Sequence, residues 1–532
     1  MDKPSIFKWS ITIAIILIIS GGAFFIYERF ADENAAAKTD LMLLIPDHCD
    51  AFLSIDQFAQ LKQVKQNTLI QSYFQSQTYP SIFKTLSRIE PFLQKNTWKS
   101  AKSNLHQMII SFHSWENSRA ELLLFKMEAG DREEIKKILG VAFKSSFPPL
   151  GESNAGIEVT HYYVSTGTKF HCFFYKGIFA GSFNNRLIDE TIVHLKNNKG
   201  TDSDADFIDV ANENEQKGSL KFFVRLNGIP LFFGNNPNRT DTLNLTEWIA
   251  PVLSFEKDKI TMNCSTSPLF ENKNWLSFLI GQTPGRPLNP AVISEKCSFC
   301  IHYGLSDLDR FNQNQQRVFG ENQKDSSIFR KDNLSIDSIF NKHFDSEINI
   351  AYYPVSVPER QYQKVIVIRL TNELEFRNKL SKLYNFREIS NDEANMNKAK
   401  MIALSESFIT SVFGQIFSLG ESLAYCDLVD NYLIVANRPE TVKSYITDIK
   451  NSDNIGDKIW YHEISGEIDS KSNLYFIGRG NSFIEDRYIL PFGLPSFLTE
   501  NQFLFRNNVF CFQFNAEESF INANGIIKQI KR

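Results

Sequence analysis

A few short stretches of the sequence bring chemically reactive side chains close together. Cys297 and Cys300 are separated by two residues, which is the spacing of many zinc and redox pairs. The run CSFCIHY that begins at Cys297 reads as a strand, where residues three positions apart point to opposite faces. No second pair completes four zinc ligands, and the seven cysteines are scattered among apolar residues. The pattern therefore favours buried thiols.

An acidic run has oxygen ligands at the spacing of a calcium-binding loop. Asp202, Asp204 and Asp206 occupy positions one, three and five, and Glu213 falls at position twelve. Position six of such a loop needs glycine for its sharp turn, and here it is Phe207. We therefore interpret the run as a solvent-exposed loop whose last aspartate caps a following helix.

Signatures of hydrolytic or nucleotide-binding enzymes are incomplete. His462 and Glu463 begin like the zinc-binding helix of a metalloprotease, but no second histidine follows at the required spacing. The stretch GQTPG at residues 281–285 has threonine where a nucleophile elbow has serine. The sequence contains no phosphate-binding loop of the GxxxxGK type. None of these stretches is a complete catalytic motif.

His113, Trp115 and Glu116 could form an acid–base cluster. A single histidine at the end of a strand is more often structural, however, and no nucleophile stands beside it in the sequence. We therefore assign no catalytic, cofactor-binding or metal-ligating residue, and we expect no cofactor.

The composition and the length bound the class of protein. The net charge is −4 with 22% charged residues, and no long basic stripe occurs. Nucleic acid is therefore a poor candidate for the partner. Phenylalanine is abundant, with 47 residues, and strands rich in it can bury a large core. A chain of 532 residues exceeds what one core usually serves, so the length predicts two domains.

The first thirty residues predict a membrane anchor. Trp9–Tyr27 is a run of 19 residues without a charge, and about 20 apolar residues span a bilayer as a helix. Lys3 and Lys8 precede the run, which places the short N-terminal tail in the cytoplasm. A cleaved signal peptide is the alternative, with three alanines at 35–37 as its small-residue site. Both interpretations predict a single-pass or processed chain whose bulk is periplasmic or otherwise extracytoplasmic.

A strand, a turn and a helix follow one another twice in the chain. Phe170–Asn197 contains aromatic strand residues, a Lys-Gly turn and a helix with an apolar stripe. Leu423–Asn451 repeats this order about 254 residues later, with Pro439 in the first helical turn, where its missing N–H needs no partner. The strands at 220–223 and 474–477 keep nearly the same offset. The sequence thus predicts two similar halves, and unrelated halves are the alternative.

Strands and helices are mixed without the regular βαβ rhythm of a parallel sheet. This predicts the α+β class, with an N-terminal transmembrane helix followed by two similar, mainly antiparallel sheet-plus-helix halves. Three prolines and a glycine at 283–290 can continue neither a helix nor a central strand. We predict a tail and anchor at 1–30, a linker at 31–40, the first half at 41–283, a Pro-rich linker at 284–290 and the second half at 291–532.

Several turn and strand patterns carry a resemblance to a known family. They are IPD at 45–47, FLSID at 52–56, GIFAGS at 177–182 and LIDE at 187–190. Together with the anchor they resemble a family of membrane-anchored bacterial envelope proteins with a domain of unknown function. The resemblance implies a bacterial origin and an envelope location, and it brings no catalytic residue.

These features together predict a non-enzymatic, membrane-tethered scaffold or binding protein of the bacterial cell envelope. The expected partners are membrane lipid, through the N-terminal helix, and an envelope protein. One alternative is an extracytoplasmic hydrolase whose site is assembled from dispersed residues. Another is a carrier of apolar ligands, suggested by the strands rich in phenylalanine.

Overall fold

The computed structural model describes two compact units of the chain. The first takes in residues up to 224 except 67–72 and 209–214, which belong to the second together with residues 225–532. The described residues are 31, 34–56, 64, 66–69, 71, 82–96, 107–115, 118–128, 131–143, 147–165, 167–197, 220–227, 246–250, 252–265, 275–319, 343–354, 362–383, 387–388, 400–480, 508–517 and 521–530.

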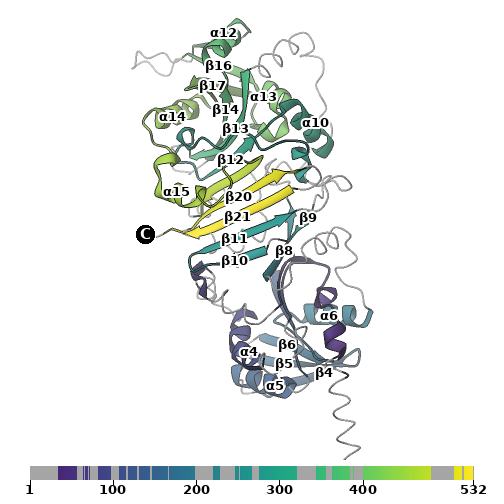
Figure 1. The fold of residues 1–532 in the computed structure, drawn as a ribbon. Helices are drawn as coiled ribbons and strands as arrows, with labels where there is room; N and C mark the ends of the chain where they lie inside the picture. Colours follow the sequence, from purple (N-terminus) through teal and green to yellow (C-terminus); the bar gives the residue numbers. More distant parts are fainter. Residues whose placement is uncertain are drawn as a thin grey trace, which may run out of the picture. The chain divides into compact units, whose positions relative to one another are not determined.

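The first unit is built on an antiparallel sheet (Figure 1). Its strand order is β8-β1-β2-β3-β7-β6-β5-β4. The strands are β1 (Cys49–Ile55), β2 (Met108–Trp115), β3 (Ser118–Lys126), β4 (Leu150–Asn154), β5 (Ile157–Ser165), β6 (Thr168–Tyr175), β7 (Ile178–Ser182) and β8 (Leu220–Asn227).

Helices cover both faces of this sheet. The described helices are η1 (Leu41–Leu44), α4 (Ile82–Asn96), α5 (Asp131–Ala142) and α6 (Asn185–Asn197). Phe143, at the end of α5, packs its ring 5.0 Å from that of Phe170 on β6. Lys196 of α6 lies 5.4 Å from the ring centroid of Tyr175 on the same strand. Because side chains alternate along a strand, Phe170 and Tyr175 point to opposite faces, and so α5 and α6 lie on opposite sides of the sheet.

The second unit is built on a longer antiparallel sheet (Figure 1). Its order is β10-β11-β21-β20-β19-β12-β13-β14-β18-β17-β16. The strands are β9 (Thr246–Ile249), β10 (Val252–Phe255), β11 (Lys259–Ser265), β12 (Phe299–Gly304), β13 (Phe344–Pro354), β14 (Tyr362–Leu370), β15 (Arg387–Glu388), β16 (Lys400–Ser405), β17 (Leu423–Val429), β18 (Tyr432–Ala436), β19 (Leu474–Arg479), β20 (Asn508–Ala516) and β21 (Ile521–Gln529).

Two cores lie on the two faces of the second sheet. On β14, Ile366 and Ile368 enter one core, whereas Val365 and Val367 enter the other. This explains the unbroken aliphatic run of β14, because each of its faces is buried and each buried aliphatic side chain contributes about 1.5–3 kcal/mol. The first core contacts α10 (Leu308–Phe319) and α13 (Glu406–Phe413), and the second contacts α14 (Pro439–Lys450) and α15 (Ile459–Ser465).

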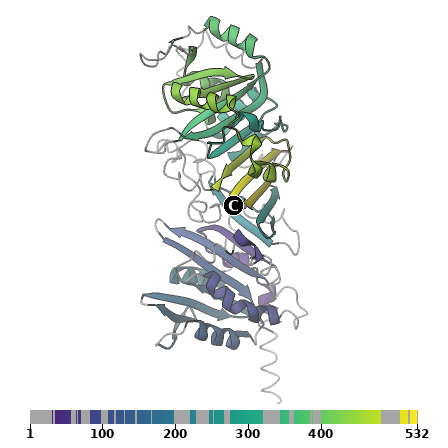
Figure 2. The ribbon, with the colours of Figure 1, turned by 90° about the vertical axis from the view of Figure 1, so that its left-hand side faces the viewer.

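The remaining described helices of the second unit are short or peripheral. α12 (Glu373–Leu383) lies at the β16–β17 end of the sheet in both ribbon views (Figures 1 and 2). Four 3₁₀ turns complete the described helices: η4 (Trp275–Leu279), η5 (Pro290–Val292), η6 (Gln415–Phe417) and η7 (Ile455–Asp457).

The two sheets share a strand order over seven strands. The sequence β8-β1-β2-β3-β7-β6-β5 in the first corresponds to β19-β12-β13-β14-β18-β17-β16 in the second. The β6–β7 hairpin turns at Lys176 and Gly177, with φ of 44° and 72°. The β17–β18 hairpin turns at Asp430 and Asn431, with φ of 49° and 63°. Two-residue hairpins favour such positive φ values because their twist then matches that of the strands.

The predicted fold class, α+β with an N-terminal transmembrane helix followed by two similar, mainly antiparallel sheet-plus-helix halves, is wrong. The β10–β11 hairpin, which the sequence places in the first half, belongs to the second unit. There β11 pairs with β21 along its whole length, from Lys259 opposite Lys528 to Ser265 opposite Asn522. The described strands thus continue as extended antiparallel sheet across the predicted division. The physical reason is that any unpaired strand edge can accept a partner, and local sequence patterns do not show which one.

The predicted membrane topology is also corrected. Within the residues that the structure describes, no helix is both long and apolar enough to cross a bilayer. The predicted helix over Trp9–Tyr27 lies outside those residues. The transmembrane helix, the signal anchor, the single-pass topology and the periplasmic or extracytoplasmic location therefore have no support in the structure, and we withdraw them.

The segment boundaries predicted from the sequence stay predictions. The structure does show how the Pro-rich stretch at 284–290 is held in place. Gly285 packs directly on the backbone of β12, where a Cβ atom added to it would lie 2.6 Å from the carbonyl carbon of Gly304. Only glycine allows this approach without a shift of the backbone. The stretch therefore lies against the sheet of the second unit.

We expect Gly285→Ala to lower the free energy of unfolding by about 1–3 kcal/mol, because the added methyl group must displace the backbone of β12. Urea unfolding followed by circular dichroism measures the change. Gly140→Ala on α5 is the matched control, since its added Cβ meets nothing within 4 Å and alanine favours a helix by up to about 1 kcal/mol. If Gly285→Ala lowers the free energy of unfolding no more than Gly140→Ala does, this packing is contradicted.

Candidate functional site

The cysteine pair is buried in one hydrophobic core. Cys297 and Cys300 are 6% and 2% exposed, and both pack into the core that contacts α14. The expectation that they point to opposite faces is wrong, because Cys297 precedes the first residue of β12 and does not follow the alternation of that strand. Burial raises the pKa of both thiols, which keeps them protonated and unreactive.

His113 has a structural role. It lies near the end of β2, with Nδ1 3.1 Å from the backbone oxygen of His48 and Nε2 2.9 Å from Oγ of Ser111. Both ring nitrogens are thus occupied, and burial lowers the pKa of His113 to about 4. Glu116, its predicted partner in acid–base chemistry, lies outside the described residues.

The remaining predicted motifs do not assemble a site. His462 and Glu463 lie on α15, and the carboxylate of Glu463 is 3.5 Å from Nζ of Lys528. In the stretch at 281–285, the side chain of Gln282 accepts hydrogen bonds from the backbone N–H groups of Ser306 and Asp307. These contacts bind one loop to another. The acidic run at 202–206 and its partner at 213 lie outside the described residues.

A polar cluster that the sequence did not reveal surrounds Glu347 on β13. One oxygen of this fully buried carboxylate accepts hydrogen bonds from Nδ2 of Asn349 at 3.0 Å and from the backbone of Asn289 at 3.2 Å. The other accepts from the hydroxyl of Tyr432 at 3.1 Å and faces Nη1 of Arg369 at 3.4 Å. Since both oxygens are occupied by protein donors, the cluster is suited to holding strands together.

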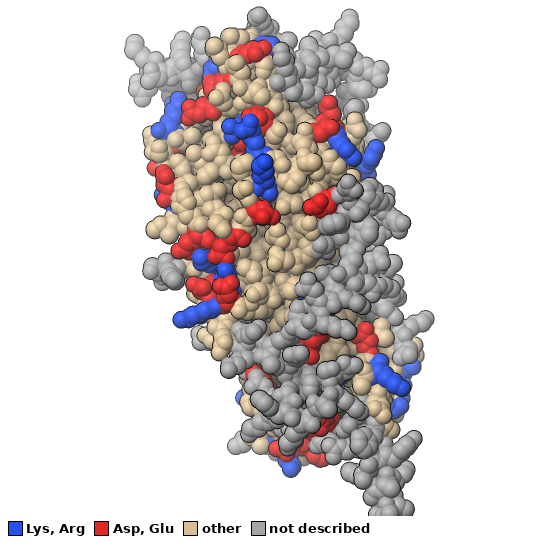
Figure 3. All heavy atoms as spheres, viewed as in Figure 1, with Lys and Arg blue, Asp and Glu red and all other residues tan. Residues whose placement is uncertain are grey.

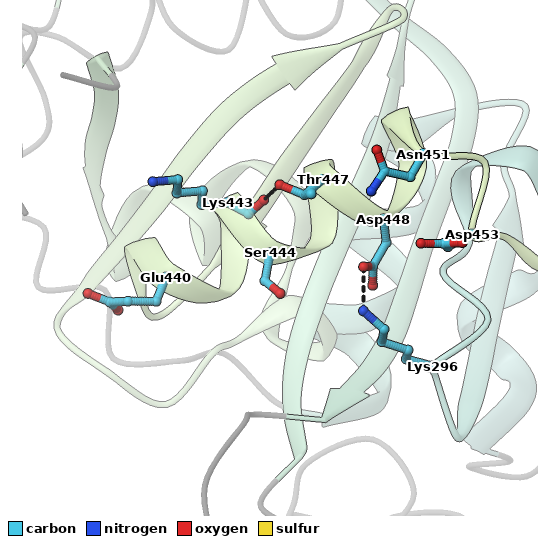
Figure 4. A pocket seen from close by; sticks show the side chains of 8 residues that line it. All are labelled: Lys296, Glu440, Lys443, Ser444, Thr447, Asp448, Asn451 and Asp453. Carbon is cyan, nitrogen blue, oxygen red and sulfur yellow. Dashed lines mark hydrogen bonds and ion pairs between the residues drawn. The ribbon is translucent and has the colours of Figure 1, made fainter. Parts of the chain in front are cut away.

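The candidate site is an open depression beside α14, with a volume of about 420 Å³ (Figure 4). Its lining is mainly polar and comes from one face of the helix and from two flanking segments. We call it the α14 depression. The residues that line it are Lys296, Glu440, Lys443, Ser444, Thr447, Asp448, Asn451 and Asp453.

The spacing of residues on α14 explains why its polar side chains gather on one face. Ser444 and Asp448 are four residues apart, and residues four apart stand one above the other on a helix. The opposite face carries Val442, Tyr445 and Ile449, which are buried in the core below. This amphipathic pattern orients the polar face of α14 toward the depression.

Asp448 is the centre of a hydrogen-bond network at the floor of the depression. Its side chain is 5% exposed and lies 2.5 Å from Nζ of Lys296 (Figure 4). Its second oxygen accepts from Oγ of Ser294 at 2.8 Å and from the hydroxyl of Tyr353 at 2.7 Å. The Tyr353 hydroxyl is also 2.9 Å from Oγ of Ser444. The ammonium of Lys296 thus balances the charge of this nearly buried carboxylate, and two hydroxyls complete its hydrogen bonds, as burial of a charge requires.

This network is not arranged for covalent catalysis. Burial, with smaller effects from its hydrogen-bond partners, raises the pKa of Tyr353, so the hydroxyl stays protonated. Both oxygens of Asp448 are already occupied by donors, so the carboxylate is not poised to take a proton from a substrate. The neighbouring thiol of Cys297 has its pKa raised by burial and, secondarily, by Asp448. The network therefore fixes the floor of the depression in one arrangement.

The first unit has different residues at the corresponding positions. In the strand register Phe112 of β2 lies opposite Ala51 of β1, and Tyr352 of β13 lies opposite Phe299 of β12. When the two sheets are matched strand by strand, these pairs are equivalent. The next residue of β2, His113, therefore corresponds to Tyr353. His194 and Asp448 are both the tenth residue of their helices, α6 and α14.

The environment of His194 also differs from that of Asp448. Its Nε2 lies 3.8 Å from Oδ1 of Asp47, and its buried Nδ1 has no hydrogen-bond partner within the described part of the chain. The first unit therefore presents imidazole groups where the second presents a carboxylate and a phenol.

Comparison with known proteins adds little. The chain matches no protein-family model and no curated protein. It resembles solved structures of TP0453. Crystal form I has a TM-score of 0.25 at 9% identity and covers 43% of this chain and 79% of that one. Crystal form III has a TM-score of 0.25 at 10% identity and covers 47% of this chain and 89% of that one. Similarity this weak does not bear on the function.

We expect the stability of the fold to fall as the pH drops from about 6.5 to about 4, in part because of His113. Its pKa is lowered on folding from 6.5 to about 4, so in this window the unfolded chain takes up a proton that the folded chain refuses. The stabilisation is complete above pH 6.5, and about 3 kcal/mol is lost below pH 4.

Urea unfolding at pH 7 and at pH 4.5 measures this loss in the native chain and in His113→Asn, where the loss is expected to be smaller. His462→Asn is the control, since His462 is exposed. An equal loss in the native chain and in His113→Asn would show that His113 is not responsible.

Proposed function

We propose that the chain is a non-catalytic binding protein whose second unit contacts a protein partner at the α14 depression. The observation that carries this proposal is the contrast between the floor and the rim of the depression. On the floor, Asp448 is bound by Lys296 and Tyr353. On the rim, Glu440 and Lys443 of α14 have no side-chain hydrogen bond or ion pair within the described part of the chain.

The chemistry of the rim favours a protein surface as the ligand. Glu440, Lys443 and Asp453 present charges of both signs around an open hollow, and protein interfaces typically have a polar, charged rim of this kind. In Figure 3 acidic and basic side chains are interspersed on the described part of the face shown. Complementary charges on a partner would set its orientation and its rate of association.

The rigid floor supports binding over catalysis. A preorganised surface loses less entropy when a partner binds, which increases affinity. The bonds of Asp448 to Ser294 and Lys296, before β12, and to Tyr353, at the end of β13, hold α14 in position. The cell envelope, as the setting of this role, rests on the sequence resemblance and stays a proposal. The alternatives, a hydrolase with dispersed residues and a carrier of apolar ligands, stay predictions.

Exchanging the two rim charges tests the site. In Glu440→Lys/Lys443→Glu the net charge and the i,i+3 spacing are preserved, while the charge pattern seen by a partner is reversed. We expect crosslinking from native cells to recover a stoichiometric protein with the native chain, and the purified partner to bind the variant at least tenfold more weakly. Tenfold corresponds to about 1.4 kcal/mol.

The control is the same exchange on α5, Glu134→Lys/Lys137→Glu, at an exposed i,i+3 pair of the first unit. It should bind like the native chain. The proposal fails if the native chain recovers no stoichiometric protein, or if the two exchanged variants bind the partner equally well.

A further inference from the structure

Two histidines meet on neighbouring strands of the first unit. His161 on β5 and His171 on β6 are directly opposite in the strand register. Their Nδ1 atoms are 2.6 Å apart, and their rings are nearly perpendicular, with centroids 4.8 Å apart. The two nitrogens thus share one hydrogen bond, and when each ring instead carries its proton on Nε2, both Nδ1 lone pairs face one point between the strands.

A carboxylate from the next strand lies beside the other ring nitrogen of His161. Glu152 lies on β4, which pairs with β5, and its Oε2 is 3.4 Å from Nε2 of His161. This ring nitrogen is buried and has no hydrogen-bond partner among the residues that the structure describes. The His161 side chain is 11% exposed and that of Glu152 is 76% exposed, so the carboxylate can move while the rings remain in place.

The chemistry of the pair suits a transition-metal ion. Neutral imidazole is a preferred ligand of Zn²⁺, Cu²⁺ and Ni²⁺, and burial together with nearby His161 and Lys169 lowers the pKa of His171 to about 4. Metal–nitrogen distances of about 2.0–2.1 Å place two tetrahedral ligands roughly 3.3 Å apart. The rings would need to separate by less than about 1 Å, which small side-chain rotations allow.

We propose that His161 and His171 form a cross-strand binding site for a divalent transition-metal ion such as Zn²⁺, which both Nδ1 atoms would ligate while Glu152 accepts a hydrogen bond from Nε2 of His161 and orients its ring. Within the described residues no group of three or more His, Cys, Asp or Glu side chains is already placed around a metal position. The site is therefore built on two nitrogens, and water completes the coordination. Such an ion would hold β5 and β6 together near the edge of the sheet.

Titration of the chelator-treated full chain with ZnCl₂ tests the site by calorimetry. We expect one ion to bind and the melting temperature to rise with zinc concentration, because an ion that binds only the folded state stabilises it. His161→Asn and His171→Asn should each weaken binding at least tenfold. Glu152→Gln should weaken it less, and His462→Asn, at an exposed histidine of α15, should not change it.

A ligand substitution separates a metal site from a structural pair. His161→Cys keeps a metal ligand but cannot keep the nitrogen-to-nitrogen hydrogen bond. With Co²⁺ as the probe, this variant should gain a thiolate charge-transfer absorption that the native chain lacks. Two results would overturn the proposal: no zinc binding by the native chain at millimolar concentration, or undiminished binding in both asparagine variants. In either case the pair is a neutral hydrogen bond within the sheet.

Discussion

The buried carboxylate of Glu347 is the constraint on which the second unit depends. It is fully buried, and a buried charge is tolerated only when it is paired and hydrogen-bonded. Its partners come from four places: Asn349 on the same strand, Arg369 on β14, Tyr432 on β18 and Asn289 before η5. Removal of Arg369, the charged one among these four partners, would leave the buried charge uncompensated, which costs about 3–5 kcal/mol. The cluster therefore specifies which strands are neighbours and where the Pro-rich stretch docks.

The α14 depression depends on this arrangement. Docking of the Pro-rich stretch sets the path of the following residues into β12, and these residues include Ser294 and Lys296. The same strand that carries Glu347 ends near Tyr353, so the register of β13 places the phenol beside Asp448. Asp448 then receives donors from two segments, of which the one with Ser294 and Lys296 is also bound to α14 by the hydrogen bond from Tyr445 to the carbonyl of Val292. A perturbation of the cluster would therefore reach the depression through the backbone, without any direct contact.

Sequence reasoning succeeded where the signal was local. The turns at 176–177 and 430–431 and the helices that follow them, α6 and α14, are where the residue pattern placed them. Sequence reasoning failed where the fold depends on contacts between residues far apart in the sequence. The pairing of β11 with β21 joins residues more than 250 positions apart, and Lys296 meets Asp448 across 152 positions. Neither the periodicity of a segment nor its turn residues indicate which distant segment it will contact. The pairing of His161 with His171 was accessible in principle, because a short hairpin fixes the register of its strands.

The two units show that a shared strand order does not imply shared chemistry. At corresponding positions the second unit has Tyr353 and Asp448, whereas the first has His113 and His194. A phenol and a carboxylate bonded to Lys296 make a neutralised, rigid floor. In the first unit both ring nitrogens of His113 are occupied, and the imidazoles of His161 and His171 are those proposed to bind an ion. The backbone arrangement sets where side chains meet, and the side chains decide what can bind there. We therefore expect the first unit to interact through nitrogen ligands and the second through charge complementarity, so that a ligand found for one unit would not predict the ligand of the other.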